Sequence, residues 1–132
     1  MKRAILMSIR KEYMDQIRAG RKTCEYRTNL PAELRVKTMK ILLYETKATG
    51  GAGAIVGQAV CAGWWLVWDP AYNIDYIPED ATEHEREYIM NTDGCYALHL
   101  REIRFYDKPV PLSRYGVKKA PQSYMYVEEV KA

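Results

Sequence analysis

Apolar runs separated by glycine, proline and charged residues divide the chain into strand-like and helix-like segments. Residues 4–9 form a short apolar run bounded by charges, which predicts a buried strand. Residues 11–19 carry apolar side chains at helical spacing, and Gly20 follows them as the kind of residue that often ends a helix. The chain is therefore expected to begin with a strand and one short helix.

Further along the chain, alternating and β-branched apolar residues predict a series of strands. A second helix is expected from Thr82 to about residue 91, because Thr82 and Glu85 have the spacing of a capping box. Residues 29–38 and 107–112 are expected to be connections. The predicted strands are residues 22–28, 39–45, 54–67, 95–105 and 120–127.

About five or six strands with two or three short helices indicate an α+β protein built on one sheet or a small barrel. The length of 132 residues falls in the usual range of one domain, about 100–200 residues. The sequence contains no repeat and no low-complexity segment. Residues 1–132 are therefore expected to form a single domain.

The segment 20–27 contains more charged, hydroxyl, thiol and aromatic side chains than an ordinary amphipathic strand needs. If it is a regular strand, alternation places Lys22 and Tyr26 on one face. Glu25 and Arg27 then lie on the other face, about 6.6 Å apart along the strand, close enough to pair or to share a ligand. The segment is either a solvated strand face or a binding site.

Charge is unevenly distributed along the chain, although the formal net charge is only +3. Residues 1–40 contain eleven Lys and Arg against four Asp and Glu, a net charge of +7. Residues 69–93 contain one Arg against eight acidic residues, a net charge of −7. This asymmetry is compatible with a basic face for a phosphate-bearing partner and an acidic arm elsewhere, or with two regions that pair or are solvated separately.

The cysteines and histidines indicate neither a disulfide framework nor a metal site. Cys24, Cys61 and Cys95 are widely spaced and odd in number, which fits a reducing cytoplasm. His84 and His99 have no neighbours at the spacing of metal ligands. No stretch approaches 18 apolar residues, so a membrane span is not expected. We expect a soluble cytoplasmic monomer without a cofactor or metal.

Several sequence elements together resemble the ASCH domain family (activating signal cointegrator homology). The most specific is Gly20-x-Lys22-x-x-Glu25-x-Arg27, which follows Ser8-Ile9 and a short helix. The resemblance covers nearly the whole chain and implies a PUA-like fold, a small β-barrel decorated by short helices. The further elements, in chain order, are Val56-Gly57, Tyr96-Ala97-Leu98 and Pro121-Gln122-Ser123-Tyr124.

The resemblance implies an RNA-associated role with a cleft beside the motif strand. Some bacterial relatives are amidohydrolases that remove the acyl group from N4-acetylcytidine, and Lys22 corresponds to their motif lysine. Their threonine nucleophile corresponds to Glu25, and a carboxylate cannot take the same acyl-transfer role without a different mechanism. Their catalytic glutamate is implied to lie in the segment that contains Glu83, Glu85 and Glu87.

The leading hypothesis is a module that binds RNA or a nucleotide-like small molecule in this cleft. Arg27 would clamp a phosphate, Glu25 would read a base edge, and Lys22 would contact a phosphate or act as a base. One alternative is a hydrolase of a modified nucleoside, or a ribonuclease, that uses Lys22 and Glu25; another is a protein-interaction module that uses residues 69–93. The remaining candidates are Tyr26, Trp64, Trp65 and Tyr124 for base stacking, and Gln122 and Ser123 for hydrogen bonds to the ligand.

Overall fold

A computed structural model describes residues 2–129 of the protein. Two α-helices, four short 3₁₀ turns and seven strands make up the described chain. The strands are β1 (Arg3–Ile9), β2 (Cys24–Arg27), β3 (Met39–Glu45), β4 (Ala54–Asp69), β5 (Ile74–Asp75), β6 (Cys95–Val110) and β7 (Tyr124–Glu128). The helices are α1 (Lys11–Arg18) and α2 (Glu83–Met90), and the 3₁₀ turns are η1 (Ala32–Arg35), η2 (Lys47–Thr49), η3 (Pro70–Tyr72) and η4 (Leu112–Tyr115).

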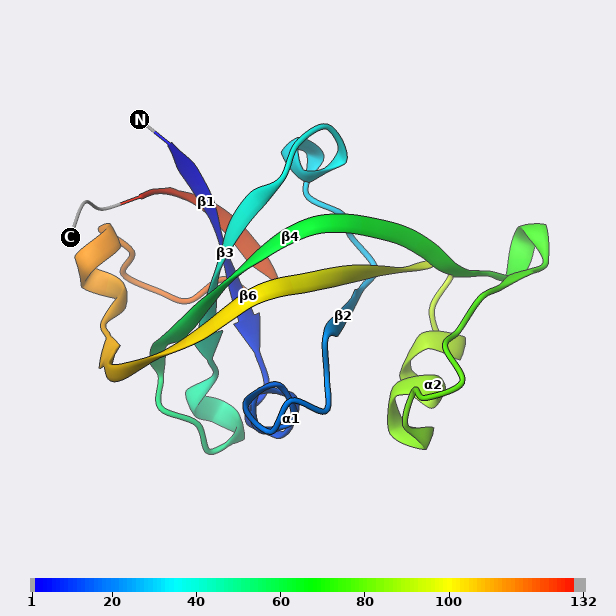
Figure 1. Cartoon of the computed structure of the whole chain (residues 1–132), viewed down its shortest axis with the longest axis horizontal. Helices are drawn as coiled ribbons and strands as arrows, with labels where there is room; N and C mark the ends of the chain where they lie inside the picture. The colour runs from blue at the N-terminus through cyan, green and yellow to red at the C-terminus, as the bar shows by residue number, and fades with distance from the viewer. Residues whose placement is uncertain (1, 130–132) are drawn as a thin grey trace.

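All seven strands belong to one mixed sheet with the order β2-β6-β4-β3-β1-β7, and β5 pairs with the end of β4. The pair β1–β3 is parallel, whereas the other neighbouring strands are antiparallel. The 16-residue strands β4 and β6 run side by side across the molecule (Figure 1). They carry α2 at one end and η4 at the other.

The sheet is curved but does not close into a barrel, because β2 and β7 are its two edges. A side chain spans the gap between these edges. The guanidinium of Arg27 on β2 donates to the carbonyl oxygen of Ser8 on β1 at 2.6 Å and to the hydroxyl of Ser123, just before β7, at 3.2 Å. The expected α+β, barrel-like fold is confirmed, with an open seam that is spanned by this arginine.

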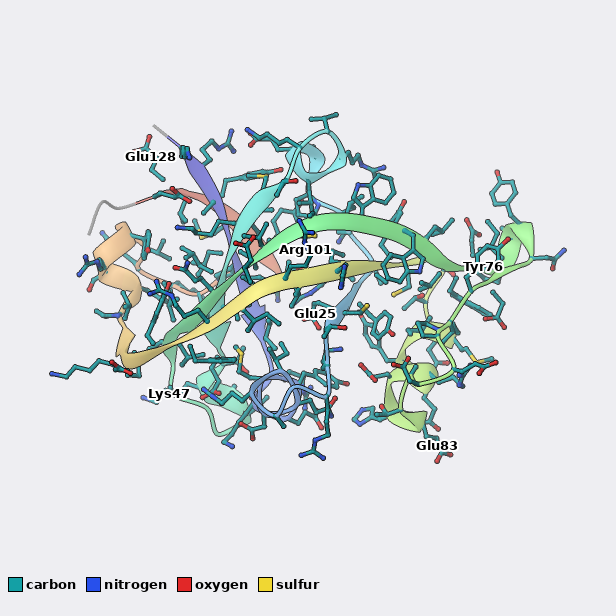
Figure 2. All side chains as sticks on the ribbon, in the orientation of Figure 1. Glu25, Lys47, Tyr76, Glu83, Arg101 and Glu128 are labelled. Carbon is teal, nitrogen blue, oxygen red and sulfur yellow. The ribbon has the colours of Figure 1, made fainter. Side chains whose placement is uncertain are left out.

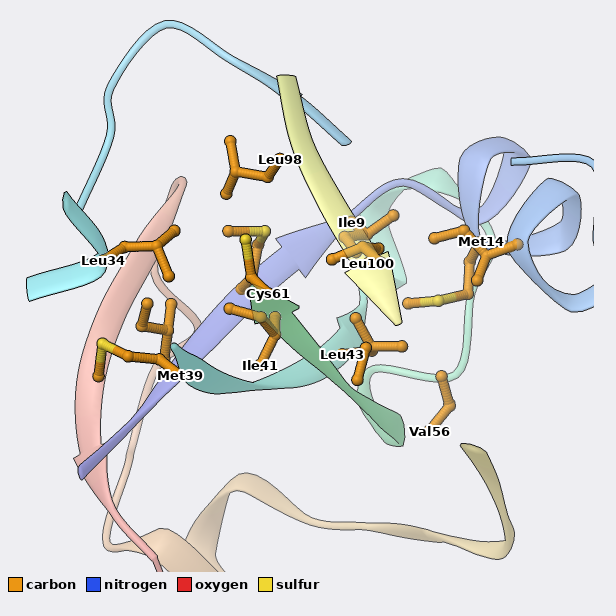
Figure 3. Packing of buried hydrophobic residues seen from close by; sticks show 14 of the residues in the cluster. Ile9, Met14, Leu34, Met39, Ile41, Leu43, Val56, Cys61, Leu98 and Leu100 are labelled. Atoms are coloured by element: carbon orange, nitrogen blue, oxygen red, sulfur yellow. The ribbon is translucent and has the colours of Figure 1, made fainter. Parts of the chain in front are cut away.

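The main hydrophobic core lies between the inner face of the sheet and α1. Met14 and Ile17 from α1 are buried against side chains from β1, β3, β4 and β6. Figure 3 shows Met14 beside this cluster, with Leu98 and Leu100 of β6 packed across it. The helical spacing of Met14 and Ile17 buries one face of α1, which fixes the helix against the sheet next to β2.

Two smaller clusters cover the opposite face of the sheet at its two ends. One contains Ile89 of α2 with Val67 and Ala97 from the sheet. The other contains Leu42 of β3 with Val117, which follows η4. Neither cluster covers the middle of that outer face, where His99 and Arg101 are exposed.

Several boundaries differ from those predicted; the last strand, β7, begins at Tyr124 and not at residue 120. Strand β2 begins at Cys24, so Lys22 precedes it. Strand β6 continues to Val110 through residues predicted to be a connection, because Val110 pairs with Ile55 of β4. Pro109 is tolerated there because the pairing with β4 is irregular between Phe105 and Val110, and proline is accepted at such bulges. The short strand β5 raises the number of strands to seven.

Candidate functional site

A pocket of about 220 Å³ lies at the open seam of the sheet. It is lined by α1, by β2, by α2, by the end of β1 and by the loop that precedes β7. In Figure 1 the segments that meet here are the lower end of β1, α1, β2 and α2. The lining residues are Ser8, Ile9, Arg10, Tyr13, Lys22, Glu25, Tyr26, Arg27, Thr46, Glu85, Tyr88 and Gln122.

Lys22 is the most deeply buried cation of the pocket, with 6% of its surface exposed. Its ammonium Nζ donates to Glu85 Oε2 at 2.6 Å and lies 3.6 Å from Glu25 Oε1. The residue sits in the turn between α1 and β2, after Gly20 has ended the helix with a positive φ of 74°. Regular strand alternation does not apply there, so Lys22 and Glu25 meet, whereas alternation predicted opposite faces.

Glu85 is held in place by the first turn of α2. Its carboxylate accepts from the backbone amide of Thr82 at 3.0 Å, and its own amide donates to the Thr82 hydroxyl. This capping box is the one that the sequence predicted. Burial acts to raise the pKa of Glu85, but the hydrogen bonds from Lys22 and Thr82 outweigh burial and lower it below its ordinary 4.5.

Arg27 fixes the position of Glu25. Its Nη2 lies 2.8 Å from Glu25 Oε2 and also donates to Ser8, while its Nη1 donates to Ser123. Its Nε is buried and has no hydrogen-bond partner within residues 2–129. The guanidinium is thus largely occupied by the protein, which makes Arg27 a positioning residue rather than a free phosphate clamp.

Aromatic rings surround the buried ammonium. The Nζ of Lys22 lies 4.8 Å from the ring centre of Tyr26 and 5.3 Å from that of Tyr13, distances at which a cation is attracted to a ring face. Tyr88 of α2 also lines the pocket and is partly exposed. Burial raises the pKa of all three phenols, so they remain neutral hydrogen-bond donors at physiological pH.

The charged groups inside the pocket balance. Two cations, Lys22 and Arg27, face two carboxylates, Glu25 and Glu85, through ion pairs of 3.6 Å or less. A buried, balanced network with aromatic walls favours a neutral ligand that offers hydrogen-bond donors to the carboxylates. Arg10 lies at the pocket with a strongly exposed side chain. Its ion pair to Glu12, at 3.1 Å, is exposed as well, so an anionic part of the ligand can still reach the guanidinium.

The structure brings together most, but not all, of the residues that the sequence singled out. Lys22, Glu25, Tyr26, Arg27 and Gln122 line the pocket. Ser123 does not line it and instead accepts from Arg27.

Trp64 and Tyr124 lie outside the pocket, which corrects the prediction that they share it. Trp64 is on β4, which β6 separates from β2, and its ring packs against Tyr96 at 5.9 Å. Tyr124 packs against Tyr126 at 6.1 Å and against the main core. Strand order, which is a long-range property, separates Trp64 from the motif. Tyr124 follows Ser123 at the seam, but its ring packs into the main core and not into the pocket.

Sequence reasoning missed two aromatic residues of the site, and it did not decide which glutamate of α2 reaches the pocket. Tyr13 is next to buried Met14 on α1, and a tyrosine at the edge of an apolar helix face is a signal that could have identified it. Tyr88 carries no comparable local signal. Of the three glutamates that the resemblance left open, Glu85 reaches the pocket, whereas Glu83 and Glu87 are exposed. Figure 2 shows Glu83 at the outer end of α2.

Within residues 2–129, no three His, Cys, Asp or Glu side chains are grouped so that they could hold a metal ion. None of the helices in this part of the chain is long and apolar enough to cross a membrane.

An open, barrel-like mixed sheet with a side-chain-lined pocket at its seam defines a small α+β protein of the PUA-like type. The chain belongs to the ASCH domain family: the family model described as "ASCH domain" matches residues 7–112. A comparison with curated protein sequences gives no significant match.

Solved structures support the same fold. The ASCH protein from Zymomonas mobilis is similar with a TM-score of 0.70 and 21% identity, over 96% of this chain and 88% of that one. A single-residue variant of that protein has a TM-score of 0.68 and 20% identity, over 96% and 91%. The N-terminal domain of Staphylothermus marinus McrB has a TM-score of 0.51 and 12% identity, over 84% and 77%. At these identities the likeness concerns the fold alone.

Proposed function

We propose that the protein binds a nucleoside unit, free or within RNA, in the pocket at the seam of the sheet. The observation that carries this proposal is the buried ammonium of Lys22, held between the carboxylates of Glu85 and Glu25 and beside tyrosine rings. This arrangement offers hydrogen-bond acceptors to the edge of a base and an aromatic wall to its face.

Size and charge support a single nucleoside rather than a longer ligand inside the pocket. A volume of about 220 Å³ lies below the usual range of sites for drug-sized ligands, roughly 300–1,000 Å³. The carboxylate of Glu25 can accept from an exocyclic amino group such as N4 of cytosine. The balanced internal charge leaves phosphates at the rim, near Arg10. Free thiols at Cys24, Cys61 and Cys95 support a reducing, cytoplasmic setting for this activity.

The test is calorimetric titration with cytidine, N4-acetylcytidine, uridine, adenosine and guanosine. At least one nucleoside is expected to bind, and Lys22→Met and Glu85→Gln are expected to weaken it by about tenfold or more, as loss of a buried charged contact does. Lys47→Met and Glu83→Gln change the same residue types at exposed positions and serve as matched controls. If every nucleoside binds no better to the wild type than to Lys22→Met, the proposal is wrong.

Hydrolysis of an acylated nucleoside is the second candidate function, and the proximity of Lys22 to two carboxylates favours it. Glu25 would remove a proton from a water molecule whose oxygen attacks the acyl carbon. The C–N bond would then break, and the leaving amine would take a proton from the ammonium of Lys22. The proton on Glu25 returns to Lys22, and Glu85 orients Lys22 throughout. The mechanism needs no threonine, which suits a chain with Glu25 at that position.

Turnover of N4-acetylcytidine, followed by chromatography, tests the hydrolase, and cleavage of single-stranded RNA tests the ribonuclease alternative. For a hydrolase, Glu25→Gln is expected to abolish turnover but only to weaken nucleoside binding, because the amide oxygen can still accept a hydrogen bond from the base but cannot take a proton from water. The rate should show a bell-shaped pH profile that Glu83→Gln leaves unchanged. Absence of turnover in the wild type with binding intact would leave a binding module and exclude the hydrolase for this substrate.

A further inference from the structure

The outer face of the sheet is covered at both ends and uncovered in the middle. Along β6, Cys95 and Ala97 are buried under α2, whereas His99 and Arg101, which follow on the same face by alternation, are exposed. The face becomes covered again around Leu42, in the cluster near η4. Figure 2 shows Arg101 on this uncovered stretch of β6.

A backbone irregularity places two arginines on this face. In a regular strand, residues 101 and 104 would point to opposite sides. Glu102 instead adopts a left-handed conformation with φ of 51°, which is uncommon for a residue other than glycine. The bulge brings Arg101 opposite Val60 and Arg104 opposite Gln58, and these two partners on β4 share one face.

The two guanidiniums keep hydrogen-bond donors for a ligand, although that of Arg104 also lies over the ring of Tyr106, 5.6 Å from its centre. Among the described residues, neither Arg101 nor Arg104 forms an ion pair, although Glu102 lies between them in the chain. Lys40 extends the row, since it pairs across the sheet with Val60, and its own ion pair to Glu129 is a partly exposed one of 3.3 Å.

An exposed aromatic ring and an open stretch of backbone lie on the same face as the cations, further along β6 toward α2. Trp65, which pairs with Ala97, is 37% exposed on this face. Next to it, a Cβ added at Gly63 would meet no atom within 4 Å, so the backbone there is open. An exposed ring beside open backbone and unpaired arginines suits a base that stacks while its phosphates meet the guanidiniums.

This face is continuous with the nucleoside pocket. His99 pairs with Cys24 of β2. Cys24 lines a second depression of about 110 Å³, and this depression shares Lys22, Tyr26 and Glu85 with the pocket. A nucleic-acid strand bound on the outer face can therefore run past the opening of the pocket.

We propose that the Trp65–Arg104 face, made of Lys40, Trp65, His99, Arg101 and Arg104, binds the flanking nucleotides of single-stranded RNA. The choice of RNA rests on the proposed function. Trp65 favours a single strand, because only an unpaired base exposes its face for stacking. The arginines supply the phosphate contacts, which are the sequence-independent part of such binding.

The experiment measures fluorescence anisotropy of a labelled single-stranded RNA of about ten nucleotides, a length typical of such sites. R101S/R104S is expected to weaken binding by about tenfold and to reduce the slope of log K against log salt by about 1.4, since two phosphate contacts are lost. W65A is expected to weaken binding by about tenfold through lost stacking. R114S/K118S, at exposed positions in and after η4, changes net charge equally and should change affinity less than about threefold.

Cytidine titration separates this inference from the proposed function. The surface variants should bind cytidine as the wild type does, since none of the changed residues lines the pocket. If R101S/R104S and R114S/K118S bind RNA equally well, the proposed face is wrong even when Lys22 variants lose cytidine. Equal affinity for duplex RNA or single-stranded DNA would overturn the assignment to single-stranded RNA.

Discussion

The ammonium of Lys22 lies 2.6 Å from a carboxylate oxygen of Glu85, although the two residues are 63 positions apart in the chain. This contact joins the turn before β2 to the first turn of α2. It also forms part of the wall between the pocket and the smaller depression beside it. One ion pair thus links the position of a helix to the geometry of the site.

The Lys22–Glu85 pair should contribute to stability in a strongly coupled manner. Lys22→Met leaves a buried carboxylate without its cation and is expected to lower the free energy of unfolding by about 3 kcal/mol or more. The double variant Lys22→Met/Glu85→Gln should lose less than the sum of the two single losses, by about 1 kcal/mol or more. Urea denaturation of the four proteins in this cycle measures the coupling, and strict additivity would show that the pair is energetically independent.

Stability should fall in acid because of Glu85. The pKa of Glu85 is lower in the folded protein than its ordinary 4.5, so the ionised form stabilises the fold above that pH. This stability is lost as the pH falls through the folded-state pKa. Melting temperatures measured between about pH 7 and pH 3 should decline less in Glu85→Gln than in Glu83→Gln. Parallel curves for these two variants would contradict the prediction.

Arg27 should act through the fold as well as through the site. Arg27→Lys retains the charge but loses the planar fork that contacts Ser8, Ser123 and Glu25 together. We expect the free energy of unfolding to fall by about 2–3 kcal/mol. A hydrogen bond to a charged group contributes about 1.5–3 kcal/mol, and its loss leaves a buried partner unsatisfied. Faster amide exchange is expected at the Ser8 amide, which donates to the Ser123 carbonyl at the end of the β1–β7 pair, next to the seam. Arg21→Lys, at an exposed position, should leave both measurements unchanged.

The capping box of α2 should influence ligand binding at a distance from the ligand. Thr82→Ala removes the hydroxyl that accepts from the Glu85 amide and is expected to cost about 1 kcal/mol of stability. Because the same turn holds the Glu85 carboxylate, nucleoside affinity should also fall. Thr38→Ala at an exposed position is the control for stability and affinity. An unchanged affinity in a destabilised Thr82→Ala protein would show that the cap does not position Glu85.

The cysteine thiols should be nearly unreactive until the protein unfolds. Burial raises the pKa of the Cys95 thiol to about 12, so almost none of it is thiolate at pH 7. Burial also raises the pKa values of Cys61 and Cys24. Titration with a disulfide reagent should therefore be slow in native buffer and rapid for all three thiols in denaturant. Rapid reaction of one thiol in the native protein would reveal local opening around it.

Local patterns in the sequence predicted most of the elements. Apolar spacing located α1, and the Thr82–Glu85 spacing located the start of α2. Residues 39–45 were predicted as a strand with the bounds that β3 has. These features depend on neighbouring residues alone, which is why they could be predicted. The end of β6 was missed because it depends on pairing with Ile55 of β4.

The sequence by itself determined the family motif and predicted a candidate site around Lys22, Glu25 and Arg27, three residues that line one pocket in the structure. Those residues lie within six positions of one another, so chain connectivity keeps them close in any fold. Which acidic residue completes the site was decided by tertiary structure. Successive helix positions differ by about 100° in direction, and burial of Ile89 against the sheet selects the rotation of α2 that turns Glu85 inward.

Tertiary structure also decided which aromatic rings belong to the site. Trp64 and Tyr124 have the right chemistry, but the strand order and the packing of the core direct them elsewhere. Tyr13 and Tyr88 reach the pocket instead, because α1 and α2 pack on either side of β2. The sequence specifies the chemistry of each side chain. Contacts between side chains across the sheet depend on long-range strand pairing and burial, which no local pattern specifies.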